Sequence, residues 1–480
     1  MKRITFLLSV LLFCSRFVHA QEQNIIAVQQ PKEVKEQPSF RLFREDENYG
    51  YLSRRSEYKK DFWDPVKYIP LDSVHGIFLS MGGQFRPRYE FFRSTKWGET
   101  KDDKAGSYSQ RIAFYTDLEI GKYVRLYGEL YHGHTTRVTR PVITEDDDAD
   151  FHQVFLDLRL PDGDQEKLTL RIGRQEMQYG SLRMISSRET PNIRRSFDAA
   201  RVMYRRERIK IDAFYGSEVT TSPKVFDNHS FKGTLIWCSY LSLPDSKFKG
   251  GDDLYYIGFH SDNSVYNDGK GRENRHSLGV RRYGNIGSVF YFNTEAIYQF
   301  GKLNTDGKPK NISAFALEFD YHYRDQKRVK LVKDVGIKFD YTSGDRQNGD
   351  DRLQSFNPLY PNPTYFGALR LMTPVNLMDV HPSITFLVWK KWELLADCDW
   401  FWRSSLEDGV YIQPRILERK GEISGERFVG TQPSLTFTGQ INRHIDFSIE
   451  SSYFITGAFV KATGLSKNEF YFSNTVSYKF

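Results

Sequence analysis

The chain has 480 residues, of which 39% are hydrophobic and 27% are charged, and its net charge at pH 7 is +7. A charge this small for the length gives no reason to expect a nucleic-acid partner. The mean hydropathy of −0.57 is that of a water-soluble protein, yet aromatic residues make up 15% of the chain, a composition that suits a fold with apolar and polar groups on alternate faces.

Residues 1–20 have the features of a secretory signal peptide. Two basic residues precede an apolar stretch over 4–13, and small residues stand at positions 18 and 20. We therefore expect cleavage before Gln21. The apolar stretch is too short to cross a bilayer as a helix, and no run of 18 apolar residues follows it, so the sequence predicts no transmembrane helix.

Residues 21–75 are polar and show no regular spacing of apolar residues. The first part is rich in Gln and charged residues, and the later part contains Tyr and Trp. Such a segment does not bury enough apolar surface to fold by itself. We expect a partly disordered periplasmic lead-in here, followed by one domain over 76–480.

From residue 78 onward, apolar and polar residues alternate strictly, as in a strand with one apolar and one polar face. The first such stretch is more than twice as long as the usual strand of about 5–6 residues. Eighteen stretches of this kind are expected, at 78–92, 107–120, 124–137, 151–160, 167–175, 198–206, 208–217, 231–242, 252–261, 274–284, 288–300, 311–323, 331–343, 382–389, 392–403, 430–440, 444–455 and 469–480.

The connections between these stretches are alternately short and long. The long ones are 93–106, 138–150, 176–197, 344–381 and 404–429. An even number of long strands, short turns at one end and long loops at the other are typical of bacterial outer-membrane barrels. We therefore predict an all-β fold, a transmembrane antiparallel β-barrel of about 18 strands with short periplasmic turns and long extracellular loops, in the outer-membrane lipid of a Gram-negative bacterium. The terminal Phe480 resembles the signal that the barrel-assembly machinery reads.

Arginines are concentrated around the third long loop. They are Arg171, Arg174, Arg183, Arg188, Arg194, Arg195 and Arg201. Earlier strands add four on the predicted lumen face, Arg86, Arg88, Arg111 and Arg125. A loop this long can fold into the lumen, where planar guanidinium groups suit carboxylates, and we expect these residues to line an anion-selective pore. The alternative is that they pair with Glu176, Glu189 and Asp198 and brace the loop.

The same region resembles the signature of the alginate export family of outer-membrane barrels. The matching residues are Gly173, Arg174, Gln175, Glu176, Tyr179, Gly180, Pro191, Asn192, Arg195, Ser196, Phe197 and Asp198. Further similarity lies at 341–345, 356–361, 365–367 and 456–457, and the resemblance covers about 76–480. It implies an 18-stranded monomeric barrel with an arginine-rich conduit for an anionic polysaccharide, and thus passive export of a polymer such as alginate.

The predicted lumen is basic along the first seven strands and acidic along the later ones. A purely anion-selective pore is expected to carry a larger basic excess, so a general or small-anion diffusion porin is the alternative function. Asp397 and Asp399 share a strand face and are interpreted as pore lining. Motifs for hydrolases and phosphate loops are missing from the sequence. A barrel enzyme such as an outer-membrane lipase is the distant alternative, and we expect no catalytic residue, cofactor or metal.

Overall fold

A computed structural model describes residues 35–100, 105–136, 144–162, 165–245, 247–325 and 330–480. The predicted signal peptide lies outside these residues. Within the described ranges, no helix combines the length and the apolar character that a membrane crossing requires.

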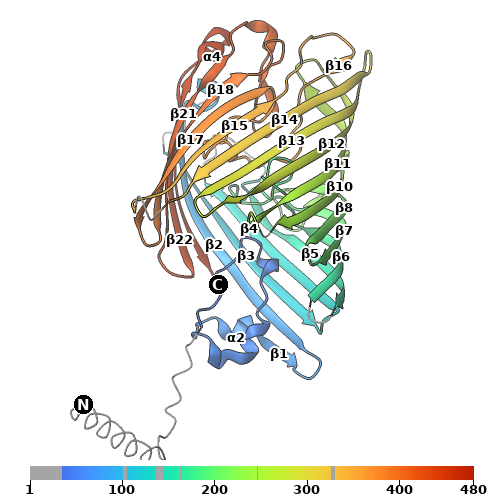
Figure 1. Ribbon diagram of the computed structural model, residues 1–480, viewed down its shortest axis with the longest axis vertical. Helices are drawn as coiled ribbons and strands as arrows, with labels where there is room; N and C mark the ends of the chain where they lie inside the picture. Colours follow the sequence, from blue (N-terminus) through green and yellow to red (C-terminus); the bar gives the residue numbers. More distant parts are fainter. Residues whose placement is uncertain (1–34, 101–104, 137–143, 163–164, 246, 326–329) are drawn as a thin grey trace, which may run out of the picture.

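In the part of the chain that the structure describes, eighteen antiparallel strands form a closed barrel, whose arrangement is visible in Figure 1. They are β2 (Ile77–Arg93), β3 (Ser107–Ile120), β4 (Val124–Thr136), β5 (Asp147–Asp162), β6 (Gln165–Gln175), β7 (Phe197–Arg206), β8 (Ile209–Thr220), β10 (Thr234–Asp245), β11 (Gly250–Tyr266), β12 (Gly269–Ile286), β13 (Phe290–Thr305), β14 (Lys310–Tyr323), β15 (Val332–Thr342), β17 (Leu377–Trp389), β18 (Trp392–Arg403), β21 (Phe428–Gln440), β22 (Ile445–Thr456) and β23 (Glu469–Lys479). Each strand pairs with the next along the chain, and the pairing of β23 with β2 closes the barrel. The predicted fold class is confirmed.

Each predicted strand corresponds to one barrel strand, but several strands extend further toward the long loops. The segment predicted at 252–261 belongs to β11, which continues to Tyr266, and β12 begins at Gly269 rather than at 274. Likewise β17 begins at Leu377 instead of 382, so the predicted loop 344–381 is shorter. Beyond the apolar band both faces of a strand are polar, and the alternation that marks a strand in the sequence disappears there.

The short elements outside the barrel wall lie in the N-terminal segment and in the loops. They are η1 (Arg44–Asp46), η2 (Gly50–Glu57), α2 (Asp64–Lys67), β1 (Ile69–Asp72), α3 (Thr95–Gly98), β9 (His229–Ser230), β16 (Arg352–Leu353), β19 (Val410–Ile412), β20 (Ile416–Arg419), η3 (Gly421–Ile423) and α4 (Ala458–Thr463). Strand β1 extends the sheet beside β2 at the end that carries the short turns.

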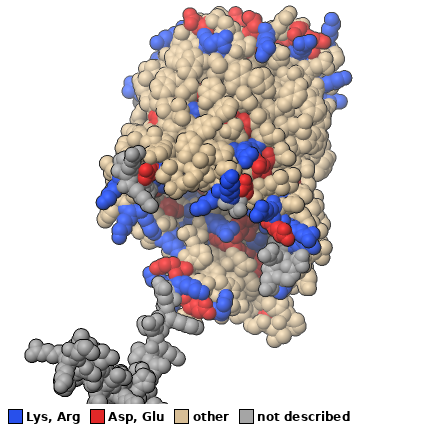
Figure 2. All heavy atoms as spheres, viewed as in Figure 1, with Lys and Arg blue, Asp and Glu red and all other residues tan. Residues whose placement is uncertain are grey.

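The two faces of each strand differ as the alternation predicts. On β3, Ile112 and Phe114 are about two-fifths exposed on the outside of the barrel, while Arg111 of the same strand is fully buried on the inside. Figure 2 shows charged side chains along the upper rim and around the lower part of the visible face, with a mostly uncharged band between them. The outside therefore offers an apolar surface to lipid, and the charges are collected in the lumen.

The N-terminal segment 35–76 lies at the short-turn end of the barrel, beside the C-terminus (Figure 1). Arg44 donates hydrogen bonds to the backbone carbonyls of Gly83, at 3.2 Å, and of Phe480, at 2.9 Å. The ring of Phe480 stacks on Trp63, with 4.2 Å between the ring centroids. This segment and the last residue of the chain thus hold each other at one end of the lumen.

Candidate channel lumen and its constriction

The loop 176–196, between β6 and β7, is attached to the wall formed by β2 and β3. Arg86 and Arg111 donate hydrogen bonds to the backbone carbonyls of 189–192 at 2.6–3.0 Å. Arg88 donates to the carbonyl of Thr190 at 2.7 Å. Buried backbone carbonyls need such partners because no water reaches them, so these three arginines fix one side of the loop.

The same loop also reaches strands on the far side of the barrel. Arg183 is fully buried and forms an ion pair with Asp340 of β15. Its guanidinium lies 3.4 Å from Glu318 of β14 and 3.9 Å from Glu295 of β13. The loop therefore crosses the lumen from one wall to the other.

The side of the loop that faces the short-turn end contacts the N-terminal segment. Arg194 donates to the backbone carbonyl of Leu42 at 3.1 Å and lies 2.7 Å from Glu176. Arg125 of β4 donates to the backbone carbonyl of Glu45 at 2.7 Å. Two segments that are far apart in sequence thus meet inside the barrel.

Buried carboxyl groups gather where these segments meet. The side-chain amide of Gln153 donates to Glu45 at 3.1 Å and to Glu129 at 2.9 Å. Burial, together with Glu176, raises the pKa of Glu45 to about 7. Burial likewise raises the pKa of Glu176 to about 8, although Arg194 opposes this rise. We therefore expect the contact between the segments to respond to pH.

Every one of the arginines expected to line the pore has an acidic or carbonyl partner. On the wall, Arg125 pairs with Asp117 and Arg171 pairs with Asp157, each at 2.7 Å from Nε. The remaining pairs are Arg174 with Asp198, Arg201 with Asp212, Arg195 with Glu218 and Arg188 with Glu218. Most of these guanidinium groups therefore brace the wall and the loop.

The residues of the family signature form the base of this loop. Gly173 has a φ of 131°, and a Cβ there would lie 2.3 Å from the carbonyl oxygen of Val154, so only glycine fits. Gly180, with a φ of 57°, follows Tyr179, whose hydroxyl donates to Asp212 at 2.7 Å. Other signature side chains are buried, namely Gln175, Glu176, Asn192 and Phe197. The signature thus specifies how the loop leaves and re-enters the wall.

The loop 176–196 narrows the lumen that it crosses and forms its constriction. A cavity of about 530 Å³ lies on the long-loop side of this constriction. Its charged lining residues are Arg188, Arg195, Arg370, Arg415, Glu90, Glu145 and Glu218. Its aromatic and proline lining residues are Phe92, Phe231, Phe259, Tyr360, Pro191, Pro361, Pro363 and Pro414. Guanidinium groups beside flat apolar surfaces can bind a carboxylate and pack against a ring. Arg370 and Arg415 were not predicted as lining residues, because they lie in irregular loops where no strand periodicity marks a lumen face.

Comparisons with known proteins agree with this architecture. The profile of the alginate export family matches residues 77–474. Structures of Pseudomonas aeruginosa OccK11 (OpdR) and OpdQ are similar, with TM-scores of 0.55 and 0.54, identities of 9% and 12%, and coverage of 84% of this chain and 96% and 98% of theirs. Acinetobacter baumannii OccAB1 has a TM-score of 0.54 at 10% identity, over 84% of this chain and 97% of that one. A search of curated proteins by sequence gives no match.

Proposed function

Because the chain belongs to the alginate export family of outer-membrane channels, we propose that it exports an anionic polysaccharide such as alginate by passive passage through its lumen. The protein is a non-enzymatic channel, so selectivity must come from the groups that a solute meets on its way. The cavity on the long-loop side of the constriction is the part of the lumen that best fits such a solute.

The observation that carries this proposal is a local excess of positive charge in the cavity. Arg188 and Arg195 share a single carboxylate, that of Glu218, at 3.9 and 2.8 Å. Burial and the neighbouring Arg195 lower the pKa of Arg188 to about 10. Two adjacent guanidinium groups with one acid between them favour an added anion.

Three further features support an acidic sugar as the solute. The guanidinium of Arg415 leaves Nη1 without a hydrogen-bond partner among the described residues and lies 4.9 Å from the ring of Tyr266. Burial and the nearby Glu90 raise the pKa of Glu145, which weakens the negative charge of the lining. The aromatic and proline residues give flat surfaces for sugar rings.

A general or small-anion diffusion porin is the second candidate. It is favoured by the near balance of four arginines and three glutamates around the cavity, since a strongly selective polymer site is expected to have a larger excess of one sign.

Block of the channel by an oligouronate separates the two candidates. In planar bilayers, we expect the oligomer to reduce the chloride current of the wild type, and the double variant Arg188→Gln with Arg415→Gln to weaken the block by about tenfold or more, the loss of two charged contacts. The two arginines make few structural hydrogen bonds, so the barrel should still fold. Arg272→Gln, on an exposed side chain, is the matched control. Equal currents with and without the oligomer would leave only the small-anion porin.

A further inference from the structure

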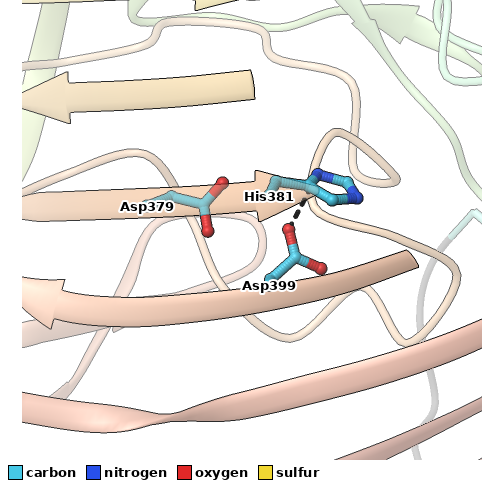
Figure 3. A group of neighbouring side chains, drawn as sticks. All are labelled: Asp379, His381 and Asp399. Carbon is cyan, nitrogen blue, oxygen red and sulfur yellow. Dashed lines mark ion pairs between the residues drawn. The ribbon is translucent and has the colours of Figure 1, made fainter. Parts of the chain in front are cut away.

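Three potential metal ligands lie together on the lumen face of β17 and β18. Asp379 and His381 come from β17 and Asp399 from β18 (Figure 3). One donor atom from each lies within 4.8 Å of the other two. The Nδ1 atom of His381 is 3.0 Å from Oδ1 of Asp399. Both aspartates are fully buried, so the group is a site in the wall and not an exposed acidic patch.

The carboxylate of Asp379 has no hydrogen-bond partner at either oxygen among the described residues. Its cross-strand neighbour on β15 is Asp340, another acid, which already pairs with Arg183. Lys338 of β15 lies opposite His381, but its ammonium donates to the carbonyl of Tyr365 at 3.0 Å. An unpartnered buried carboxylate is costly, and a bound cation would remove that cost.

The surroundings hold the other two side chains in a ligating geometry. The second ring nitrogen of His381, Nε2, lies 3.5 Å from Oδ1 of Asp397. Metal-binding histidines commonly direct their other N–H at a carboxylate, which fixes the ring and its tautomer. Gln432 donates to Oδ2 of Asp399 at 3.3 Å, and this leaves Oδ1 of that aspartate directed toward the histidine.

We propose that Asp379, His381 and Asp399 bind a divalent first-row transition-metal ion, for which Zn²⁺ is the probe. Imidazole nitrogen suits zinc, iron and nickel, and carboxylates complete such sites. Calcium is disfavoured because it takes 6–8 oxygen ligands. Two donors on one ion at about 2.0–2.2 Å each lie at most about 4.4 Å apart, so donors within 4.8 Å of one another need to approach by only a few tenths of an ångström. The ion neutralises two charges of the acidic wall.

The strand pattern in the sequence did not reveal this group. Alternation places Asp397 and Asp399 on the lumen face, which led to their interpretation as pore lining, and it does not show that His381 of the preceding strand lies beside them. The loop residue Gly367 lies over the site, since a Cβ there would be 3.9 Å from Oδ2 of Asp399.

Titration calorimetry on the full-length protein, freed of tags and treated with chelator in detergent, tests the site. We expect the wild type to bind Zn²⁺, and Asp379→Asn and His381→Gln to bind it at least tenfold more weakly. Asp397→Asn should weaken binding by about 10- to 100-fold, the usual effect of removing a group that orients a ligand. Asp379→Asn should also remove the rise in Tm that Zn²⁺ causes in the wild type.

Asp320→Asn is the matched control, because Asp320 and Asp334 also flank a histidine, His322, but both are hydrogen-bonded to it. Its Zn²⁺ affinity should equal that of the wild type. Undetectable binding by the folded wild type would overturn the proposal. Binding that Asp379→Asn and His381→Gln leave unchanged would do the same, since the ion would then occupy another place.

Discussion

The wall formed by β2 to β8 and the wall formed by β13 to β18 use buried charge in opposite ways. In the first wall, Arg125 and Arg171 each face an aspartate at 2.7 Å. In the second wall, Asp379 has no hydrogen-bond partner in the described part of the chain. Charges that pair within the protein fix its structure, whereas charges without partners stay available for ions from outside.

The loop 176–196 joins the two walls, and this explains the direction of its charges. It offers backbone carbonyls to the arginines of β2 and β3, and it offers Arg183 to the acids of β13 to β15. Each wall thus receives the partner that it lacks. We call the wall of β2 to β8 the paired wall. We expect a substitution on it to destabilise the loop, and a substitution elsewhere in the lumen to alter ion binding or passage.

The largest effect is expected from Arg111→Ala. Arg111 is fully buried and contacts Glu189, Pro191 and Asn192 of the loop. Removing one partner of a buried charged network costs about 3–5 kcal/mol, and the loop should become accessible to protease from the long-loop side. Unfolding in urea and limited proteolysis measure these effects. Arg282→Ala, which removes an exposed ion pair with Asp252, should change the free energy of unfolding by no more than about 0.5 kcal/mol. A fully protected loop in Arg111→Ala would show that the paired wall does not hold it.

A smaller effect is expected at the contact between the N-terminal segment and the loop, and it depends on pH. Burial and Glu176 raise the pKa of Glu45 from 4.5 to about 7. Groups that face Glu45 include Glu129, Gln153, Arg125 and Arg171. A carboxyl with a raised pKa stabilises the inserted segment fully below pH 4.5, and this stabilisation is lost as pH rises through about 7.

Channel conductance between pH 4.5 and 8 therefore tests the inserted segment. We expect conductance to increase with pH as the segment leaves the lumen more often, and Glu45→Gln, which stays neutral, to reduce the dependence. His75→Gln, at an exposed ion pair with Asp72, serves as the control and should leave the pH dependence of the conductance unchanged. The same pH dependence in Glu45→Gln and in the wild type would show that Glu45 does not control the inserted segment.

Much of the fold could be predicted from the sequence, because a strand between lipid and water must alternate apolar and polar residues where it crosses the apolar band. The lumen position of Arg86 and Arg111 follows from the same rule. Their partners could not be predicted, since the rule does not say which loop returns to the lumen or which carbonyls it presents. Arg370 and Arg415 lie in irregular loops, where no periodicity marks a lumen face. Asp379, His381 and Asp399 come from two neighbouring strands, and the pattern within one strand does not show which residues of the next strand lie beside it.

The reversal potential of single channels in a KCl gradient shows directly whether the lumen prefers anions. The shared Glu218 leaves Arg188 and Arg195 with a local positive excess in the cavity. We therefore expect a reversal potential that is shifted from zero toward the equilibrium potential of chloride. The double variant Arg188→Gln with Arg415→Gln should move it toward zero. A shift toward the equilibrium potential of potassium would show that the channel prefers cations. An inserted protein that carries no current at any pH between 4.5 and 8 would show that the barrel is not an open channel for anions.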